Sequence, residues 1–162
     1  MKKAVYPGSF DPITLGHVDI IERASSFVSE LHILIADNYR KSYTFTNEER
    51  IEMTRKALSH LDNVVVSYSG GLVVDYAKEN GCDLIIRGLR NIADYENEYQ
   101  LFQLNKNINE DIETIVLFPS SRNQAVSSSA VKELLIHNGD ITKYVPKIII
   151  NDILTKFKNK LY

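Results

Sequence analysis

The sequence lacks three features that would each point to a particular class of protein. It has no excess of basic residues, since 19 Lys and Arg face 21 Asp and Glu for a net charge of -2 at pH 7, so we expect no nucleic-acid partner. No apolar run approaches the roughly 20 residues that span a bilayer, which predicts no membrane partner. Pro7 and Gly8 interrupt the first apolar run before the core of a signal peptide could form. We therefore expect a cytoplasmic protein.

Cysteine and histidine are too sparse for several kinds of chemistry. Cys82 is the only cysteine, which excludes an internal disulfide framework, and we predict that it is a small core residue in a protein of a reducing compartment. The four histidines, at positions 17, 32, 60 and 137, are scattered, so the sequence shows no cluster of zinc ligands. It also shows no pattern of serine, histidine and carboxylate that would predict a nucleophilic serine.

Two common phosphate-binding motifs are missing as well. The sequence contains no G-x-x-x-x-G-K-[ST], which excludes a P-loop, and no G-x-G-x-x-G, which excludes the dinucleotide fingerprint. We therefore expect any phosphate to be held by imidazole and hydroxyl groups instead of a glycine cradle.

The order of apolar runs predicts an α/β fold. We expect a single domain over residues 1–162 with a Rossmann-like, doubly wound, mostly parallel five-stranded sheet and helices on both faces. The strands are expected near residues 2–6, 31–36, 63–67, 83–87 and 114–118, and the helices near 17–28, 47–60, 71–80, 93–108, 128–137 and 146–158. Thr46 with Glu49 resembles a capping box, Gly81 and Gly139 are expected where helices stop, and Pro146 suits a first helical turn.

Polar and cationic residues concentrate in the segments that follow the expected strands. These segments are PGSFDPITLGH, ADNYRKSYTF, SYSGGL, RGLRN and PSSRNQAVSSS. In a sheet of this type, ligands collect outside the carboxyl ends of the strands. The five segments are therefore expected to share one rim.

The first of these segments has the residues of an anion site. Gly8 and Ser9 offer a close backbone approach and a hydroxyl, and Pro12 stiffens the turn. His17 is expected in the first turn of the following helix, where free amides also attract an anion. The alternative is that Thr14 caps the helix and His17 is a solvated first-turn residue.

Two arginines follow the fourth strand. Arg87 ends a buried run, and an arginine there needs an anionic partner to offset the cost of its desolvation. Phosphate is the expected partner of Arg87 and of Arg90. The alternative is ion pairs with Asp94, Glu96 or Glu98 in the next helix.

The last segment ends in three serines, Ser127, Ser128 and Ser129. One serine suffices to cap a helix, whereas three would surround an anion with hydroxyls and helix-terminal amides. The alternative is a flexible polar loop. Arg40 and Lys41 add positive charge to the same rim, and the sequence leaves open which of the two makes the main phosphate contact.

Together, these groups predict a site for more than one phosphate that is poor in general bases. Such a site suits phosphoryl or nucleotidyl transfer, in which positioning and charge stabilisation dominate. It suits best an acceptor that is itself a phosphate monoester. Because the second pKa of such a group is about 6, the acceptor is already ionised at neutral pH and needs no base.

Three segments carry a resemblance to a known family. GSFDPITLGH, IRGLR with the ADYENE helix after it, and VSSSAVKE resemble the bacterial phosphopantetheine adenylyltransferases. These belong to the nucleotidyltransferase superfamily that a [TH]-x-G-H motif marks, and the resemblance runs nearly end to end. It implies transfer of an adenylyl group from ATP to 4'-phosphopantetheine, giving dephospho-CoA and pyrophosphate, with Mg²⁺ bound through the ATP phosphates and no metal ligand from the protein. It also implies a hexamer and coenzyme A as a feedback ligand.

The resemblance further implies a set of site residues. The catalytic groups would be His17, Lys41 and Arg90, and the acceptor would contact Ser9, Lys41, Leu72, Val73 and Arg87, with Leu101 and Asn105 as weaker candidates. ATP would contact Ser9, Phe10, His17, Gly88, Leu89, Arg90, Glu98, Asn123, Gln124, Ala125, Val126, Ser127, Ser128 and Ser129. We expect direct in-line attack by the acceptor phosphate without a covalent intermediate.

Two other functions remain open from the sequence. One is a related adenylyl- or cytidylyltransferase that uses nicotinate mononucleotide or an alcohol phosphate as acceptor. The other is a nucleotide-binding module without catalysis, although such a module would not need His17. Ser9 stands where the family commonly has threonine, and residues 123–125 are less aromatic than is typical of the family.

Overall fold

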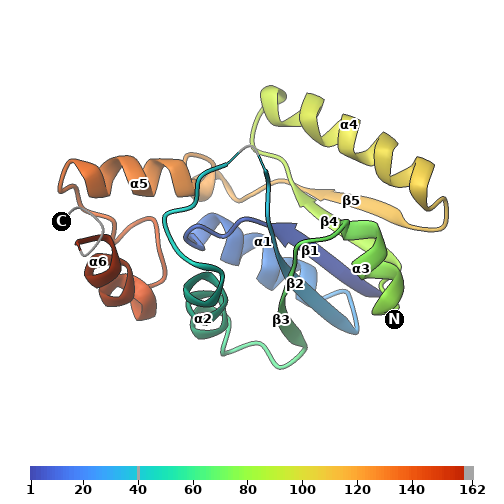
Figure 1. Ribbon diagram of the computed structural model, residues 1–162, viewed down its shortest axis with the longest axis horizontal. Coiled ribbons are helices and arrows are strands. Elements are labelled where there is room, and N and C mark those ends of the chain that lie inside the picture. Colours follow the sequence, from blue (N-terminus) through green and yellow to red (C-terminus); the bar gives the residue numbers. More distant parts are fainter. Residues whose placement is uncertain (40, 159–162) are drawn as a thin grey trace.

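A parallel β-sheet forms the centre of the protein, whose structure is a computed structural model that describes residues 1–39 and 41–158. Within these residues the strands are β1 (Lys3–Gly8), β2 (Glu30–Ala36), β3 (Val64–Ser69), β4 (Leu84–Gly88) and β5 (Glu113–Leu117). They pair in the order β3-β2-β1-β4-β5, and every pairing is parallel (Figure 1). The predicted five-stranded, doubly wound sheet is therefore confirmed.

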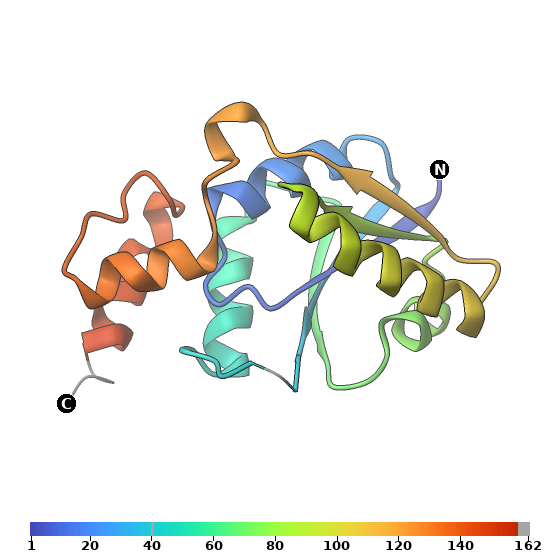
Figure 2. The same ribbon diagram turned by 90° about the horizontal axis from the view of Figure 1, so that it is seen from above.

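Helices connect the strands and extend beyond them. In the described part of the chain they are α1 (Leu15–Ser25), α2 (Asn47–Ala57), α3 (Val73–Glu79), α4 (Ile92–Ile108), α5 (Ser128–Ile136) and α6 (Ile150–Lys158). Two short 3₁₀ turns, η1 (Ser121–Asn123) and η2 (Lys147–Ile149), precede α5 and α6. In both ribbon views α5 and α6 lie beyond the carboxyl ends of the strands (Figures 1 and 2). They therefore stand next to the edge of the sheet at which ligands are expected.

Side chains that alternate along the strands build two apolar clusters on opposite faces of the sheet. Ala4 and Tyr6 of β1 belong to the larger cluster, which includes buried side chains of α1, α2, α5 and α6. Val5, between them, belongs to the smaller cluster, which α3 covers. Cys82 is buried in this second cluster, as predicted, and its thiol is unpaired. Burial raises the pKa of Cys82 to about 11.

The ends of the helices test the local signals in the sequence. Thr46 and Glu49 form the predicted capping box, each side chain accepting the backbone N–H of the other. Gly81 follows α3 in the left-handed conformation, with φ at 67°. After α5, however, the left-handed residue is Asn138, with φ at 54°, and not Gly139. Asparagine tolerates this conformation better than most residues, so it ends the helix one position earlier.

The apolar C-terminal segment packs within its own chain. Ile149, Ile153 and Phe157 are buried in the larger cluster, and Pro146 directly precedes the η2 turn that leads into α6. The face of α6 that these residues form is therefore used for intramolecular packing. Within the described residues, no helix is both long and apolar enough to cross a membrane.

Helix α4 differs from the other helices because none of its residues is buried. Polar contacts hold it against the sheet, with Glu98 paired to Arg87 of β4 and Lys106 paired to Glu113 of β5. Several of its large apolar side chains are exposed instead: Ile92, Tyr95, Tyr99, Leu101, Leu104 and Ile108. These apolar side chains of α4 consequently have no cover in the single chain.

Candidate active site

A cavity of about 440 Å³ opens at the carboxyl ends of β1 and β4. Strands β2 and β3 lie on one side of β1, and β4 and β5 lie on the other side. The order of the strands therefore reverses between β1 and β4, where ligands of such sheets usually bind. The sequence-predicted residues that line it are Ser9, Phe10, His17, Lys41, Arg87, Gly88, Arg90, Glu98, Asn123, Val126, Ser127, Ser128 and Ser129. The rim expected from the sequence is thus largely assembled in one place.

Other predicted residues lie outside this cavity. Leu72 is the N-cap of α3 and half-exposed, and Val73 begins that helix and packs against the smaller apolar cluster. Leu89 lines a neighbouring apolar depression of about 310 Å³ instead. Neither Gln124 nor Ala125 lines the main cavity, although both neighbours of this pair do. Leu101 and Asn105 are also outside it, and Arg40 lies outside the described residues.

The first loop is bent tightly so that an aromatic ring supports the histidine. Phe10 has φ at 47°, in the left-handed region that a bulky residue rarely adopts. Its ring meets the ring of His17 edge-on, with the two centroids 4.9 Å apart. A Cβ atom on Gly8 would lie 2.9 Å from the Phe10 ring, so only glycine fits at that position. The loop therefore places the ring of Phe10 against one side of His17.

His17 is also fixed by the helix that it begins. Thr14 is the N-cap of α1, and its hydroxyl accepts the backbone N–H of His17 at 3.4 Å. In return, Nδ1 of His17 accepts the backbone N–H of Thr14 at 3.1 Å. The two sequence interpretations therefore both hold in part: Thr14 caps the helix, and His17 is a first-turn residue, but it lines the cavity instead of a solvated face. Burial, and then Arg90 and Lys41, lower its pKa to about 4.

Both predicted arginines are paired with carboxylates of α4. Arg87 donates from Nη2 to Glu98 at 2.6 Å and from Nε to the same carboxylate, and its Nη1 donates to the carbonyl of Pro7 at 3.2 Å. Arg90 donates from Nε to Asp94 at 3.0 Å. The ion pairs considered from the sequence therefore form in this structure. They fix the two guanidinium groups at the cavity wall.

The serine segment is ordered by specific contacts. Ser127 caps α5 by accepting the N–H of Ala130 at 3.1 Å, and Ser128 donates to the carbonyl of Pro12 at 2.8 Å. A Cβ atom on Gly16 would lie 3.2 Å from the carbonyl oxygen of Val126, so this glycine allows the segment to approach α1 closely. The segment is consequently attached to the first loop instead of forming a free polar loop.

Sequence reasoning missed two charged residues of the cavity wall, Asp11 and Lys132. Asp11 has an exposed fraction of only 2% and accepts the N–H of Thr44 at 2.9 Å, the N–H of Phe45 at 2.9 Å and Nζ of Lys132 at 2.9 Å. An aspartate before a proline resembles an ordinary turn residue, and Lys132 resembles an exposed helix position. The sequence carried no signal for either role except their presence in the two segments GSFDPITLGH and VSSSAVKE.

The charges of the cavity favour anions. Its cations are Lys41, Arg87, Arg90 and Lys132, and its carboxylates are Asp11, Asp94 and Glu98. Each carboxylate is paired with one cation. None of the ion pairs among the described residues includes Lys41. Residues 1–39 and 41–158 also contain no group of three or more His, Cys, Asp or Glu side chains that could hold a metal ion.

Comparisons with known proteins agree with this architecture. A family model described as cytidylyltransferase-like matches residues 5–134. A solved structure from Vibrio parahaemolyticus, assigned as a nicotinate-nucleotide adenylyltransferase, superposes with a TM-score of 0.67 at 19% identity and covers 96% of both chains. At this identity the likeness shows the fold alone.

Two curated relatives are much closer in sequence. The chain is 45% identical over 158 residues to a phosphopantetheine adenylyltransferase of Finegoldia magna, with 98% of each chain covered. It is 44% identical over 151 residues to a phosphopantetheine adenylyltransferase of Nautilia profundicola, with 93% of this chain and 98% of that protein covered. The chain therefore belongs to the phosphopantetheine adenylyltransferase family of cytidylyltransferase-like proteins.

Proposed function

We propose that the cavity transfers the adenylyl group of ATP to 4'-phosphopantetheine, giving dephospho-CoA and pyrophosphate in coenzyme A biosynthesis. The observation that carries this proposal is the position of His17, at the N-terminus of α1 and in one cavity with Lys41, Arg87 and Arg90. The three cations can neutralise several phosphates at once, and His17 can add a hydrogen-bond donor. The two relatives with 44% and 45% identity carry the name of this activity.

The hydrogen bonds of His17 determine how it acts on the α-phosphate. A backbone amide can only donate, so the bond from the Thr14 N–H requires Nδ1 of His17 to be an acceptor. The proton of the neutral ring is then on Nε2. With a pKa of about 4 the free protein keeps this ring neutral at pH 7. His17 is thus a fixed N–H donor that stabilises charge developing on the α-phosphate.

The other residues divide between the two substrates. Ser9 and Lys41 hold phosphates on either side of the reacting centre, and Arg87 grips the acceptor phosphate together with Lys41. Arg90 and the serine segment lie toward the leaving pyrophosphate. The other ATP contacts proposed are Phe10, Gly88, Leu89, Glu98, Asn123, Gln124, Ala125, Val126, Ser127, Ser128 and Ser129. Contact of Leu72 and Val73 with the pantetheine arm stays a prediction.

The scheme uses no general base, which agrees with an acceptor that is already ionised. The cavity carboxylates Asp11, Asp94 and Glu98 are each held by a cation, and His17 uses its unprotonated nitrogen to accept a backbone N–H. A phosphate monoester with a second pKa of about 6 attacks without losing a proton to the enzyme. Direct in-line displacement at the α-phosphorus therefore needs no covalent intermediate and no general base.

We also propose Mg²⁺ as the cofactor, bound through ATP. Its preferred ligands are oxygens, and in nucleotide sites substrate phosphates and water supply most of them. The paired carboxylates of this cavity fit that mode better than a metal cage made by the protein alone. When bound, the ion neutralises phosphate charge, while Lys41 and the arginines orient the same groups.

The test is pyrophosphate release from ATP with three acceptors in parallel reactions. Release is expected only with 4'-phosphopantetheine, because Arg87 and Lys41 place that acceptor's phosphate for attack. Release with nicotinate mononucleotide or glycerol phosphate instead would identify a different transferase. ATP binding without release under any of the three conditions would indicate a module without catalysis.

A variant of His17 serves as the catalytic control in this assay. His17→Ala removes one preorganised donor, so kcat is expected to fall about 10²- to 10³-fold with little change in KM. His17→Gln, which keeps an amide donor of similar reach, is expected to lose less. A raised KM with unchanged kcat in His17→Ala would instead assign His17 to ground-state binding alone.

The low pKa of His17 also makes stability depend on pH. Between pH 6.5 and about 4 the unfolded chain binds a proton on this ring and the folded chain does not, so protonation favours unfolding. The free energy of unfolding is expected to fall in this range by up to about 3 kcal/mol, at about 1.4 kcal/mol per pKa unit. Urea denaturation at pH 7 and pH 4 measures this loss, which should be smaller in His17→Gln. Equal losses in the two proteins would contradict the lowered pKa.

We further propose a hexamer, supported by the exposed apolar side chains of α4. Leu104 and Tyr99, near the middle of this helix, are each about half-exposed. A charge at Leu104 should therefore disrupt assembly, and light scattering of Leu104→Glu is expected to give a smaller mass than the sixfold mass of wild type. Ile148→Glu is the control, because Ile148 is an exposed aliphatic residue on η2. Loss of the hexamer in both variants, or in neither, would show that α4 is not the specific assembly contact.

Two further proposals concern regulation and location. Coenzyme A contains the product's pantetheine and nucleotide parts and is a candidate competitor for this cavity, which inhibition of the same pyrophosphate assay would reveal. A cytoplasmic location is supported by the unpaired thiol of Cys82, and fractionation of cells that express the protein would test it.

A further inference from the structure

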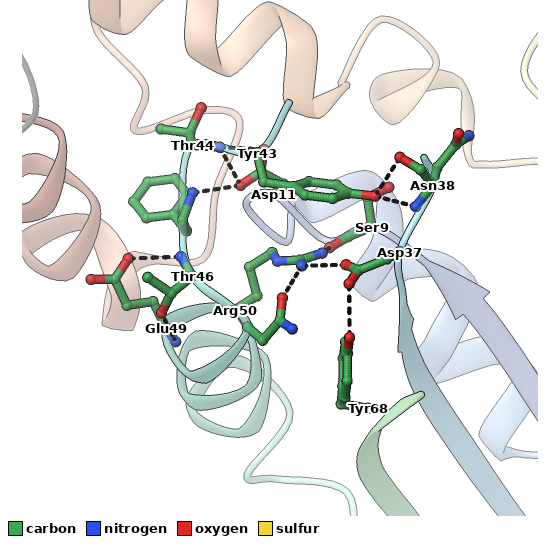
Figure 3. Close-up of polar contacts among 12 residues, drawn as sticks. Ser9, Asp11, Asp37, Asn38, Tyr43, Thr44, Thr46, Glu49, Arg50 and Tyr68 are labelled. Carbon is green, nitrogen blue, oxygen red and sulfur yellow. Dashed lines mark hydrogen bonds and ion pairs between the residues drawn. The ribbon is translucent and has the colours of Figure 1, made fainter. Parts of the chain in front are cut away.

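A buried arginine outside the phosphate-binding groups connects two loops of the site. Arg50 lies in the first turn of α2 and has an exposed fraction of 0%. Figure 3 shows its side chain reaching from α2 toward Ser9 and Asp37. Nη1 donates to the carbonyl of Ser9 at 2.9 Å, and Nη2 donates to Oδ1 of Asp37 at 2.8 Å and to Oδ1 of Asn47.

The same guanidinium also contacts the far end of the loop that bears Lys41. Its Cζ atom lies 4.0 Å from the centroid of the Tyr43 ring, within the range of a cation–π contact. Asp37 begins this loop directly after β2, so Arg50 contacts the residues on both sides of the turn. The hydroxyl of Tyr68 donates to Oδ2 of Asp37 at 2.8 Å and fixes that carboxylate further.

Within the loop, backbone contacts close the turn between these two anchors. The N–H of Lys41 donates to the carbonyl of Asn38 at 2.9 Å, and the hydroxyl of Tyr43 contacts both the N–H and the carbonyl of Asn38. The N–H of Lys41 is therefore bound to Asn38, between Asp37 and Tyr43, the two residues of the loop that contact Arg50. The carbonyl of Ser9 is held by the same side chain.

Stability alone is a poor explanation for this arrangement. Burying a guanidinium is costly, and a buried ion pair often contributes no more to stability than apolar side chains of equal volume. Nε of Arg50 also has no hydrogen-bond partner among the described residues, which adds to the cost. Within the described residues, the hydrogen bonds and the cation–π contact of this guanidinium go to Ser9, to Asp37 and Tyr43, and to Asn47 of its own helix.

We propose that Arg50 is a positioning residue that sets Ser9 and Lys41 at a fixed separation across the reacting phosphates. The proposal rests on the proposed function, in which Ser9 and Lys41 bind phosphates. A planar guanidinium can donate to the Ser9 carbonyl, donate to Asp37 and stack on Tyr43 at the same time. A lysine ammonium keeps the charge but cannot make these three contacts together.

The experiment compares two conservative substitutions in the same helix. Arg50→Lys is expected to lower kcat/KM for 4'-phosphopantetheine about 10- to 100-fold, since misplacing a reacting group by about 1 Å costs as much as 10²-fold. Arg55→Lys is the matched control. Nη2 of Arg55 donates to the carbonyl of Val66 on β3 at 3.3 Å and does not contact the loop. The expected change in kcat/KM for Arg55→Lys is less than about twofold, because substitutions outside the core and outside buried polar networks usually have small effects.

A double-mutant cycle separates positioning from simple destabilisation. If Arg50 acts partly through Lys41, Arg50→Lys should cost less activity in the Lys41→Met background than it costs alone, because only its effect through Ser9 then remains, so the two effects are non-additive. All rates are measured per folded protein, at a temperature below the unfolding transition of each variant. Additive effects of Arg50→Lys and Lys41→Met, or unchanged activity in Arg50→Lys, would overturn the proposal.

The single Lys41→Met variant tests the underlying assignment independently. If this variant keeps full activity, the role of Lys41 fails, and with it the basis for positioning by Arg50. If Arg50→Lys does not fold, Tyr43→Leu takes its place, because it removes the stacked ring from a loop outside the apolar core. A loss of at least about 10-fold that disappears in the Lys41→Met background is expected, and no loss would overturn the proposal.

Discussion

The carboxylate of Asp11 is the contact on which the architecture of the site depends most. It joins three segments that are distant in sequence: its own loop after β1, the loop before α2 through Thr44 and Phe45, and α5 through Lys132. A carboxylate with an exposed fraction of 2% is tolerated only because two amides and an ammonium satisfy it. The first of these segments leads into α1 and His17, the second carries Lys41, and Ser128 and Ser129 begin α5. One buried charge thereby holds the groups that must meet around the substrates.

Arg50 also connects the first loop to the loop that bears Lys41, as Asp11 does. It binds the Ser9 carbonyl and the loop that bears Lys41, whereas Asp11 binds the amides at the end of that loop. The two contacts together explain how a short stretch without regular structure can present a lysine reproducibly. Catalysis by charge stabilisation requires such preorganisation, because a donor that must first be ordered contributes less to the transition state.

Three of the cations of the cavity are held in place by ion pairs with carboxylates. Arg87 and Arg90 are each paired with a carboxylate from α4, so neither guanidinium is left uncompensated when no phosphate is present. His17 is kept neutral by burial and by the nearby cations. An incoming polyphosphate therefore meets oriented donors in a protein whose net charge is -2.

The sequence predicted well what depends on neighbouring residues. The alternation of strands and helices, the Thr46–Glu49 capping box and the burial of Cys82 follow from short-range patterns, and all three are confirmed. The expected grouping of the five polar segments followed from the rule that ligands bind at the carboxyl ends of parallel strands. Gly139 was expected to end α5, but Asn138 adopts the left-handed conformation, because two suitable residues stood side by side.

Contacts between distant residues were not predictable in this way. Asp11 and Lys132 are 121 positions apart, and Ser9 and Arg50 are 41 apart. No periodic pattern links such pairs, and each residue alone resembles a turn residue or an exposed helix position. Likewise, Leu72 and Val73 follow a strand as the rim rule requires, yet β3 is an edge strand, away from the point between β1 and β4 where the cavity forms.

The proposed function rests on direct transfer of the adenylyl group between the two substrates, with no covalent bond to the enzyme. The most direct measurement is the stereochemical course of the reaction with ATP that carries a chiral α-phosphorothioate. One in-line displacement by the acceptor phosphate requires inversion at the α-phosphorus. Retention would require two displacements through a covalent adenylyl-enzyme and would contradict the roles proposed for His17, Lys41 and the arginines.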